Sequence, residues 1–98
     1  MYQLRTTHLF DSWFRKLRDK KARARIQVRL DRLELGNLGD VAPVGSSVSE
    51  LRIDYGPGYR VYITRRSQFL IILLAGGNKA TQVKDIALAK RLAKQLGK

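Results

Sequence analysis

Length, composition and charge set the first limits on what this protein can be. The chain has 98 residues, the length of a single domain, and its 20 Lys and Arg against 8 Asp and Glu give a net charge of +12. It contains no cysteine, which excludes disulfides and thiolate metal sites, and it has no apolar run long enough to cross a bilayer. The basic excess is shared by residues 1–35 and 36–98. We therefore expect a cytoplasmic domain, not bound to a membrane, that binds nucleic acid or an acidic protein.

The N-terminal part predicts a strand followed by two helices. The weak alternation of residues 1–6 indicates an edge strand, and Thr6 or Thr7 is suited to cap the helix that follows. The apolar residues of that helix recur at i, i+3, i+4 and i+7, as Phe10, Trp13, Phe14 and Leu17. A corner at 19–21 leads into a second helix that ends near Gly36, with a core stripe of Ala22, Ile26, Leu30 and Leu33. The two helices are expected to form an antiparallel hairpin.

The C-terminal part predicts three strands and a last helix. Residues 37–47 contain Gly39, Pro43, Gly45 and paired serines, which indicates a loop. Strands are expected at 48–55, 59–65 and 69–75, and the segment 76–80 is expected to leave the last strand. Thr81 is suited to cap a helix that reaches about Leu96, and the outer side of the last strand is suited to pack against this helix or a partner. The expected fold is one α/β (α+β) domain, residues 1–98, in the order β-α-α-β-β-β-α.

The parity of the central hairpin predicts which side chains share a face. Matching apolar to apolar residues across the two strands leaves a three-residue loop at 56–58. In this register Asp54 lies opposite Arg60, and Arg52 lies opposite Tyr62, on the face away from the expected core. Arg52, Arg60 and Tyr62 are therefore expected to form one exposed polar patch.

Two segments carry a resemblance to a known family. The segments "ELRIDYGPGYRVYI" (50–63) and "ILLAGGNKATQVKDI" (72–86) together resemble the RelE/ParE superfamily of bacterial toxins, in particular its HigB-like addiction module killer proteins. The N-terminal segment is similar to the same branch, so the resemblance covers nearly the whole chain. The order of elements expected above agrees with the fold that the resemblance implies.

The resemblance implies the toxin of a bacterial type II toxin–antitoxin system. Many such toxins enter the ribosomal A site and cut mRNA as endoribonucleases, without a metal or cofactor. The 2′-hydroxyl of the RNA is the nucleophile, and the product carries a cyclic phosphate. A cognate antitoxin, expected to be acidic, would block the toxin, and the toxin–antitoxin complex would bind operator DNA through the antitoxin. The alternative is a ParE-like toxin that inhibits DNA gyrase by binding and cuts nothing, because one fold serves both functions.

The residue types and the resemblance together select the candidate site. Arg52 and Arg60 can bind phosphate oxygens with two hydrogen bonds each and remain charged, although Arg60 could instead pair with Asp54. Lys79 is an exposed loop lysine or, as the resemblance implies, a contact of the scissile phosphate. Tyr62 either packs within the sheet, stacks on a base, or transfers a proton at a lowered pKa. The expected catalytic residues are Arg52, Arg60, Lys79 and Tyr62, and the expected RNA-binding residues are Arg65, Arg66, Gln82 and Lys84.

Metal chemistry is not expected, and the proton carriers are not assigned. The chain has one histidine, His8, which suits a surface or capping role, and its carboxylates Glu50 and Asp85 stand isolated in the sequence. Some RelE-type toxins carry a tyrosine or histidine near the C-terminus, and this chain has neither after Tyr62. The candidates for general base and acid are Tyr62, a lysine such as Lys79, or a group of the ribosome.

Overall fold

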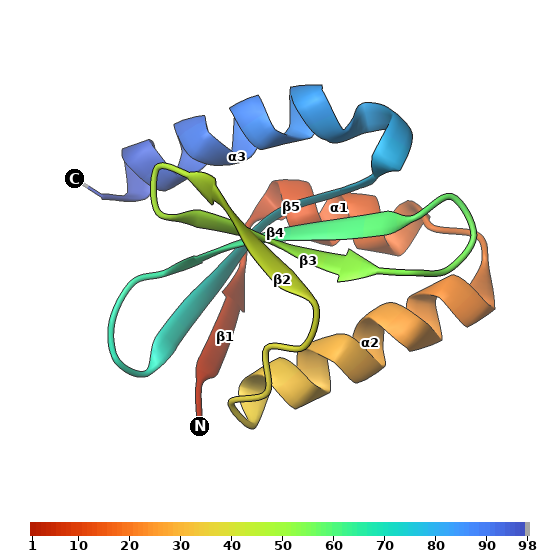
Figure 1. The fold of residues 1–98 in the computed structure, drawn as a ribbon, viewed down its shortest axis with the longest axis horizontal. Helices are drawn as coiled ribbons and strands as arrows, with labels where there is room; N and C mark the ends of the chain where they lie inside the picture. The colour runs from red at the N-terminus through yellow and green to blue at the C-terminus, as the bar shows by residue number, and fades with distance from the viewer. Residues whose placement is uncertain (98) are drawn as a thin grey trace.

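The computed structural model describes residues 1–97 and has three layers, with a five-stranded mixed sheet in the middle (Figure 1). The elements are β1 (Gln3–Thr6), α1 (His8–Lys16), α2 (Lys20–Glu34), β2 (Val41–Gly45), β3 (Val48–Ile53), β4 (Tyr59–Arg65), β5 (Leu70–Asn78), a 3₁₀ helix η1 (Lys79–Thr81) and α3 (Gln82–Leu96). The strand order is β1-β5-β4-β3-β2, with β1 and β5 parallel and the other neighbours antiparallel. No helix within residues 1–97 has the length and apolar character that a bilayer crossing requires.

Helices α1 and α2 begin at residues whose side chains cap them. Thr7 is the N-cap of α1, and its hydroxyl accepts a 3.0 Å hydrogen bond from the Phe10 amide. Asp19 caps α2 by accepting from the amides of Lys21 and Ala22. The predicted stripe of α2 is buried, and the two helices run in opposite directions as predicted (Figure 1).

The region predicted as a loop, residues 37–47, contains the edge strand β2. Val41 pairs with Leu51 and Pro43 with Ser49, and the ladder is interrupted by an irregularity between Pro43 and Gly45. Pro43 was one of the residues that predicted a loop. Proline lacks an amide donor but is tolerated in an edge strand, and β2 is such a strand. The predicted order β-α-α-β-β-β-α is therefore wrong by one strand.

The sheet is covered on both faces, which corrects the expectation of one exposed polar face. Helices α1 and α2 pack on one face, where Phe10, Ile26 and Leu33 meet the apolar residues of β3, β4 and β5. Helix α3 packs on the other face (Figure 1), where Ala89 belongs to one buried cluster with Tyr62 of β4 and Leu74 and Ala75 of β5. The two layers of helices explain why residues 61–64 of β4 are all buried, although their sequence alternates between the two faces.

The β3–β4 hairpin has a register two residues away from the predicted one. Arg52 lies opposite Arg60, and Glu50 lies opposite Tyr62, so the predicted pairs of Arg60 with Asp54 and of Arg52 with Tyr62 are wrong. A shift of two residues preserves the faces, and Arg52, Arg60 and Tyr62 do share one face as predicted.

The longer hairpin loop follows from a contact that the hairpin sequence does not contain. Tyr55 leaves the ladder, and its ring lies 4.6 Å from the guanidinium carbon of Arg25 on α2. This cation–π contact replaces the predicted pairing of Tyr55 with Tyr59, and the loop becomes the five residues 54–58.

The two glycines after residue 75 belong to β5, whereas the sequence analysis placed them outside the strand. A methyl group on Gly76 would lie 2.1 Å from the indole of Trp13 on α1. A methyl group on Gly77 would lie 1.8 Å from the Asp85 carboxylate on α3. The pair therefore lets helices on opposite faces approach the same stretch of β5.

Candidate nucleic-acid interface

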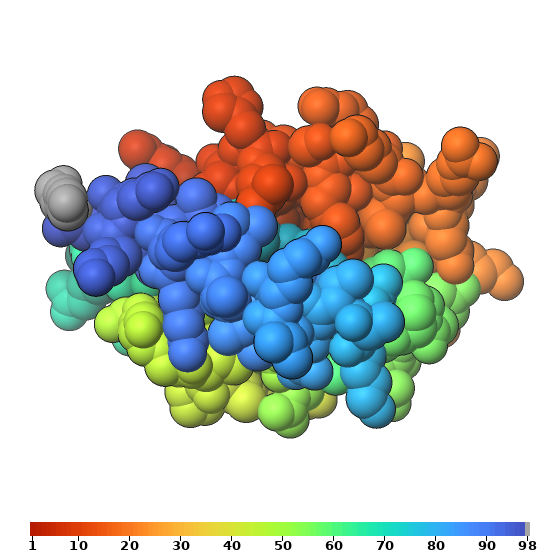
Figure 2. All heavy atoms as spheres, turned by 90° about the horizontal axis from the view of Figure 1, so that it is seen from above, coloured from red at the N-terminus to blue at the C-terminus, as the bar shows by residue number. Residues whose placement is uncertain are grey.

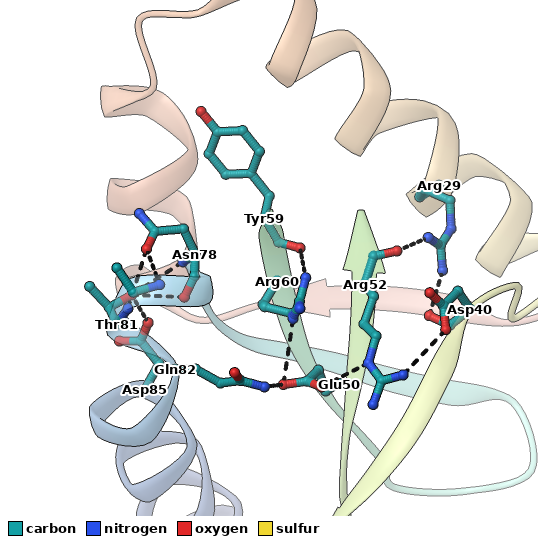
Figure 3. A network of polar contacts seen from close by, with 11 residues as sticks. Arg29, Asp40, Glu50, Arg52, Tyr59, Arg60, Asn78, Thr81, Gln82 and Asp85 are labelled. Atoms are coloured by element: carbon teal, nitrogen blue, oxygen red, sulfur yellow. Dashed lines mark hydrogen bonds and ion pairs between the residues drawn. The ribbon is translucent and has the colours of Figure 1, made fainter. Parts of the chain in front are cut away.

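A buried carboxylate organises the polar side chains on the α3 face of the sheet. Glu50 on β3 has a side chain that is only 2% exposed. Its Oε1 accepts a 2.5 Å hydrogen bond from Gln82 Nε2 at the start of α3 and lies 3.8 Å from Arg60 Nε, while its Oε2 accepts a 3.1 Å hydrogen bond from Arg52 Nε (Figure 3). We call these four residues the Glu50 cluster. They come from β3, β4 and α3 and place two guanidinium groups on either side of one carboxylate.

Arg52 lies at the open side of the Glu50 cluster. Its side chain is 43% exposed, and its Nη1 lies 3.7 Å from the Asp40 carboxylate. The backbone near Arg52 is held by Arg29 of α2, whose guanidinium donates to the carbonyls of Arg52, Leu38 and Asp40 (Figure 3). Arg52 is thus fixed at its backbone and its Nε, and its outer edge faces solvent.

Arg60 is more enclosed, because its side chain is only 12% exposed. Its Nη1 donates a 3.2 Å hydrogen bond to the Tyr59 carbonyl, and its buried Nε has no hydrogen-bond partner within residues 1–97. Lys79 lies next to it: a methyl group on Gly58 would be 3.5 Å from Lys79 Cβ and 3.6 Å from Arg60 Nη1. The end of β5 therefore brings an exposed lysine close to a restrained arginine, two residues that the sequence had indicated separately.

Tyr62 occupies a different environment from the predicted one. Its side chain is 0% exposed beneath α3, and its hydroxyl has no hydrogen-bond partner among the described residues. Burial, together with the nearby carboxylates of Glu50 and Asp85, raises the pKa of Tyr62, so of the three alternatives for this residue the structure agrees with packing and not with proton transfer at a lowered pKa. Stacking of this ring on a base is incompatible with the closed arrangement of α3, so the expected exposure of Tyr62 is wrong.

The turn between β5 and α3 is a capped structure. Asn78 accepts hydrogen bonds from the amides of Ala80 and Thr81, and the Thr81 hydroxyl accepts from the Asn78 amide. Asn78 is therefore the capping residue, and Thr81 makes no side-chain cap to α3. The Thr81 hydroxyl also lies 2.5 Å from Asp85, so neither Glu50 nor Asp85 is isolated in the fold.

Comparison with known proteins gives one relative that spans the chain. The sequence is 52% identical over 95 residues to an uncharacterized protein of Haemophilus influenzae, and the match covers 97% of this chain and 96% of the relative. The chain belongs to the same family as that protein. No family model matches the sequence.

The predicted RNA-binding residues do not form one surface with the Glu50 cluster. Gln82 belongs to the cluster, and Lys84 is exposed in the first turn of α3. Arg65 and Arg66 lie at the other end of β4, beside a separate groove of about 710 Å³. We call it the Ser47 groove, after the β2–β3 turn that borders it, and Figure 2 shows this turn and the β4–β5 turn flanking the C-terminal half of α3.

Glu50, the residue that connects the site, is not among the predicted site residues. A signal was present, because Glu50 alternates onto the same face of β3 as Arg52. Its isolation in the sequence argued only against a two-metal site, whereas a buried carboxylate is expected to be paired with cations. No group of three or more His, Cys, Asp or Glu side chains suited to a metal occurs within residues 1–97.

Proposed function

We propose that this protein is the toxin of a bacterial type II toxin–antitoxin system and cuts mRNA on the ribosome. The observation that carries the proposal is the juxtaposition of Arg60 and Lys79 at one end of β4 in a domain of net charge +12. We also propose that the fold is RelE/ParE-like and that the protein belongs to the HigB-like branch. The resemblance of residues 50–63 and 72–86 to those toxins supplies the reaction, and the geometry supplies residues that suit it.

Arg60 suits the stabilisation of charge on a phosphate. The reaction proposed is attack of the RNA 2′-hydroxyl on the adjacent phosphorus, which breaks the bond to the 5′-oxygen and leaves a cyclic phosphate. Negative charge then grows on the phosphate oxygens, and a cation already fixed in position lowers the barrier by a few kcal/mol. Arg60 is held through its Nη1 and by the Glu50 carboxylate, so little reorientation would be needed.

The other members of the site would act around Arg60. Lys79 is exposed and would contact the scissile phosphate, while Arg52, at the open side, would bind a neighbouring one. Gln82 is bonded to Glu50 and would contact RNA only at the edge of the site. Lys84, Arg65 and Arg66 are exposed and would bind the backbone further along the strand.

Glu50 is a positioning residue in this proposal. Its carboxylate is 2% exposed and contacts Arg52, Arg60 and Gln82, so it orients the cations and does not reach RNA. Tyr62 is enclosed as well. The proton of the 2′-hydroxyl would therefore pass to a group of the ribosome, and Lys79, as a charged ammonium group, or a second ribosomal group would give a proton to the departing 5′-oxygen.

The partners follow from the proposed function and the charge. An acidic antitoxin would be attracted to the basic surface and would associate rapidly at low salt. The complex would bind operator DNA through the antitoxin, and the free toxin would act in the cytoplasm on mRNA in the ribosomal A site.

Primer extension in a reconstituted translation system tests the proposal. The wild type, Arg60→Ala and the control Arg18→Ala are compared with and without ribosomes; Arg18 is exposed and lies between α1 and α2. Cuts in frame with codons, made only with ribosomes and lost only in Arg60→Ala, would support an endoribonuclease that uses Arg60. An intact message in all reactions would refute cleavage, and inhibition of supercoiling by gyrase would then favour the alternative toxin function.

A further inference from the structure

We propose that the Ser47 groove is a second binding site, separate from the Glu50 cluster, for the sugar–phosphate backbone of a nucleic acid. Five cations line the groove, and within residues 1–97 no carboxylate does; the cations are Arg65, Arg66, Lys90, Arg91 and Lys94. Like charges gathered around one hollow repel each other, and an anion bound between them removes that repulsion. This inference does not depend on the proposed cleavage.

The groove is too far from the Glu50 cluster to be an extension of it. Arg65 lies five positions after Arg60 in β4, which corresponds to about 17 Å along a strand. Along α3, Gln82 belongs to the Glu50 cluster and Lys94 to the groove, twelve residues or about 18 Å apart. Both sites lie on the α3 side of the sheet, so one nucleic acid strand that follows α3 would meet both.

The wall formed by the β2–β3 turn contains two serines whose backbone is held in place. Ser46 and Ser47 have φ values of 55° and 63°, a conformation that glycine or asparagine adopts more readily than serine. The turn is held by the Thr64 hydroxyl, which donates a 2.8 Å hydrogen bond to the Ser47 carbonyl. Serine at these positions therefore adds two hydroxyl groups to the lining of the groove, although its backbone is strained there. Hydroxyl groups are common donors to phosphate oxygens.

The opposite wall brings a lysine of α3 close to the same turn. A methyl group on Gly45 would lie 3.2 Å from Lys90 Nζ, which places the ammonium group against the turn. Arg66 has an interaction that can explain its position without a ligand. Its Nη1 would lie 3.6 Å from a methyl group on Gly97, so its charge can interact favourably with the C-terminus of α3. Arg65 is also engaged, because its Nε donates to the Ser67 carbonyl and its guanidinium carbon lies 5.3 Å from the centre of the Tyr2 ring. These interactions leave Lys90, Arg91 and Lys94 of the groove unexplained.

The composition of the groove favours a nucleic acid over an acidic protein segment. Of the residues that line it, only Ala93 and Gly97 lack a polar side chain. Protein partners usually insert apolar or aromatic anchors into an apolar core, and the groove offers none. Cations and hydroxyls without an apolar centre are the set that contacts a phosphate backbone.

The test is the binding of a fluorescent, single-stranded 2′-O-methyl RNA, measured by anisotropy over a range of salt concentrations. This probe lacks the 2′-hydroxyl nucleophile, so binding is measured whether or not the protein cleaves RNA. The groove variant Lys90→Gln/Arg91→Gln/Lys94→Gln is compared with the control Arg15→Gln/Lys16→Gln/Arg18→Gln, which removes the same charge from exposed positions near the end of α1. Circular dichroism establishes that both variants fold.

The groove variant is expected to bind about tenfold more weakly than the control, with a slope of log K against log salt that is smaller by about two. Equal affinities and equal slopes for the two variants would overturn the proposal, as would a poly-glutamate competitor that binds the groove while RNA does not. Single-stranded and duplex DNA probes identify the kind of nucleic acid. If both DNA probes bind more weakly than the RNA probe, the site is for RNA, and if they bind equally well, the site accepts any nucleic acid. If the wild type does not cleave mRNA but the groove variant still binds RNA more weakly than the control, the proposed function is refuted and the proposal for the groove is not.

Discussion

Glu50 on β3 and Gln82 at the first residue of α3 are joined by a 2.5 Å hydrogen bond between Gln82 Nε2 and Glu50 Oε1. The same carboxylate contacts Arg52 and Arg60. The helix that covers the sheet and the two arginines of the candidate site therefore share one anchor. A change at Glu50 should affect the stability of the fold and the orientation of both arginines at once.

Replacing Glu50 with Gln tests this anchor. The variant keeps the shape but removes the charge that compensates Arg60, whose side chain is only 12% exposed. Leaving a largely enclosed cation without its partner is expected to lower the free energy of unfolding by about 2–4 kcal/mol. Urea denaturation provides the measurement, and the control is Asp54→Asn, at an exposed loop position where only a small change is expected. Equal stabilities for the two variants would show that Glu50 does not hold the arginines.

Gly76→Ala is expected to destabilise the protein by about 1–3 kcal/mol, because the added methyl group would lie 2.1 Å from the rigid indole of Trp13. The matched control is Gly97→Ala, where the nearest atom would be 3.4 Å away and little change is expected. Combining Gly76→Ala with Trp13→Leu should cost less than the sum of the single changes, because the leucine vacates the ring position. Additive free energies of unfolding would mean that the two residues are not in contact.

Tyr62→Phe is expected to leave the protein as stable as the wild type or more stable by about 1 kcal/mol at neutral pH, since its buried hydroxyl has no partner within residues 1–97. The raised pKa of Tyr62 also predicts a difference at high pH. The unfolded state loses this proton near pH 10, while the folded state retains it, so wild-type stability falls as the pH rises above about 10.

The phenylalanine variant lacks this titration, so its advantage in thermal midpoint should grow above pH 10. A variant that is clearly less stable at neutral pH would indicate that the Tyr62 hydroxyl forms a hydrogen bond inside the protein. A constant difference at all pH values would indicate that Tyr62 titrates equally in both states.

The Ser46→Asn/Ser47→Gly variant tests the strained turn. Asn-Gly is the preferred sequence for a two-residue hairpin turn with positive φ, so we expect an increase in unfolding free energy of about 0.5–1 kcal/mol. The variant also removes two hydroxyls from the Ser47 groove, and RNA binding should weaken several-fold. Thermal unfolding and anisotropy measure the two effects separately. A more stable variant with unchanged RNA affinity would show that the two serine hydroxyls do not contribute to RNA binding.

The helices of this protein could be predicted because their signals are local. Thr7 caps the helix three residues before Phe10, and the spacing from Ala22 to Leu33 defines the buried stripe of α2 without reference to the rest of the chain. The C-terminal helix was likewise predicted to end near Leu96, where it does end.

The sheet and the site depend on partners that are distant in the sequence. Pro43 and Gly45 resemble loop residues until β3 supplies the neighbour that makes them an edge strand. Tyr55 leaves the hairpin for Arg25, thirty residues earlier in the chain. Glu50 acquires its role from Gln82, thirty-two residues later. Residue patterns along one element could not supply these contacts, and the predicted loop, register and exposed patch failed for that reason.

The parallel pairing of β1 with β5 places Gln3 beside Leu70. A chain synthesised from its N-terminus carries β1 without its neighbour until most of the protein has been made, and contacts between such distant residues form slowly. The Glu50 cluster also cannot form completely until Gln82 has been synthesised. Both the sheet and the cluster therefore become complete only near the end of translation. The activity proposed above, which needs Arg60 held by the completed cluster, would therefore be absent from the unfinished chain.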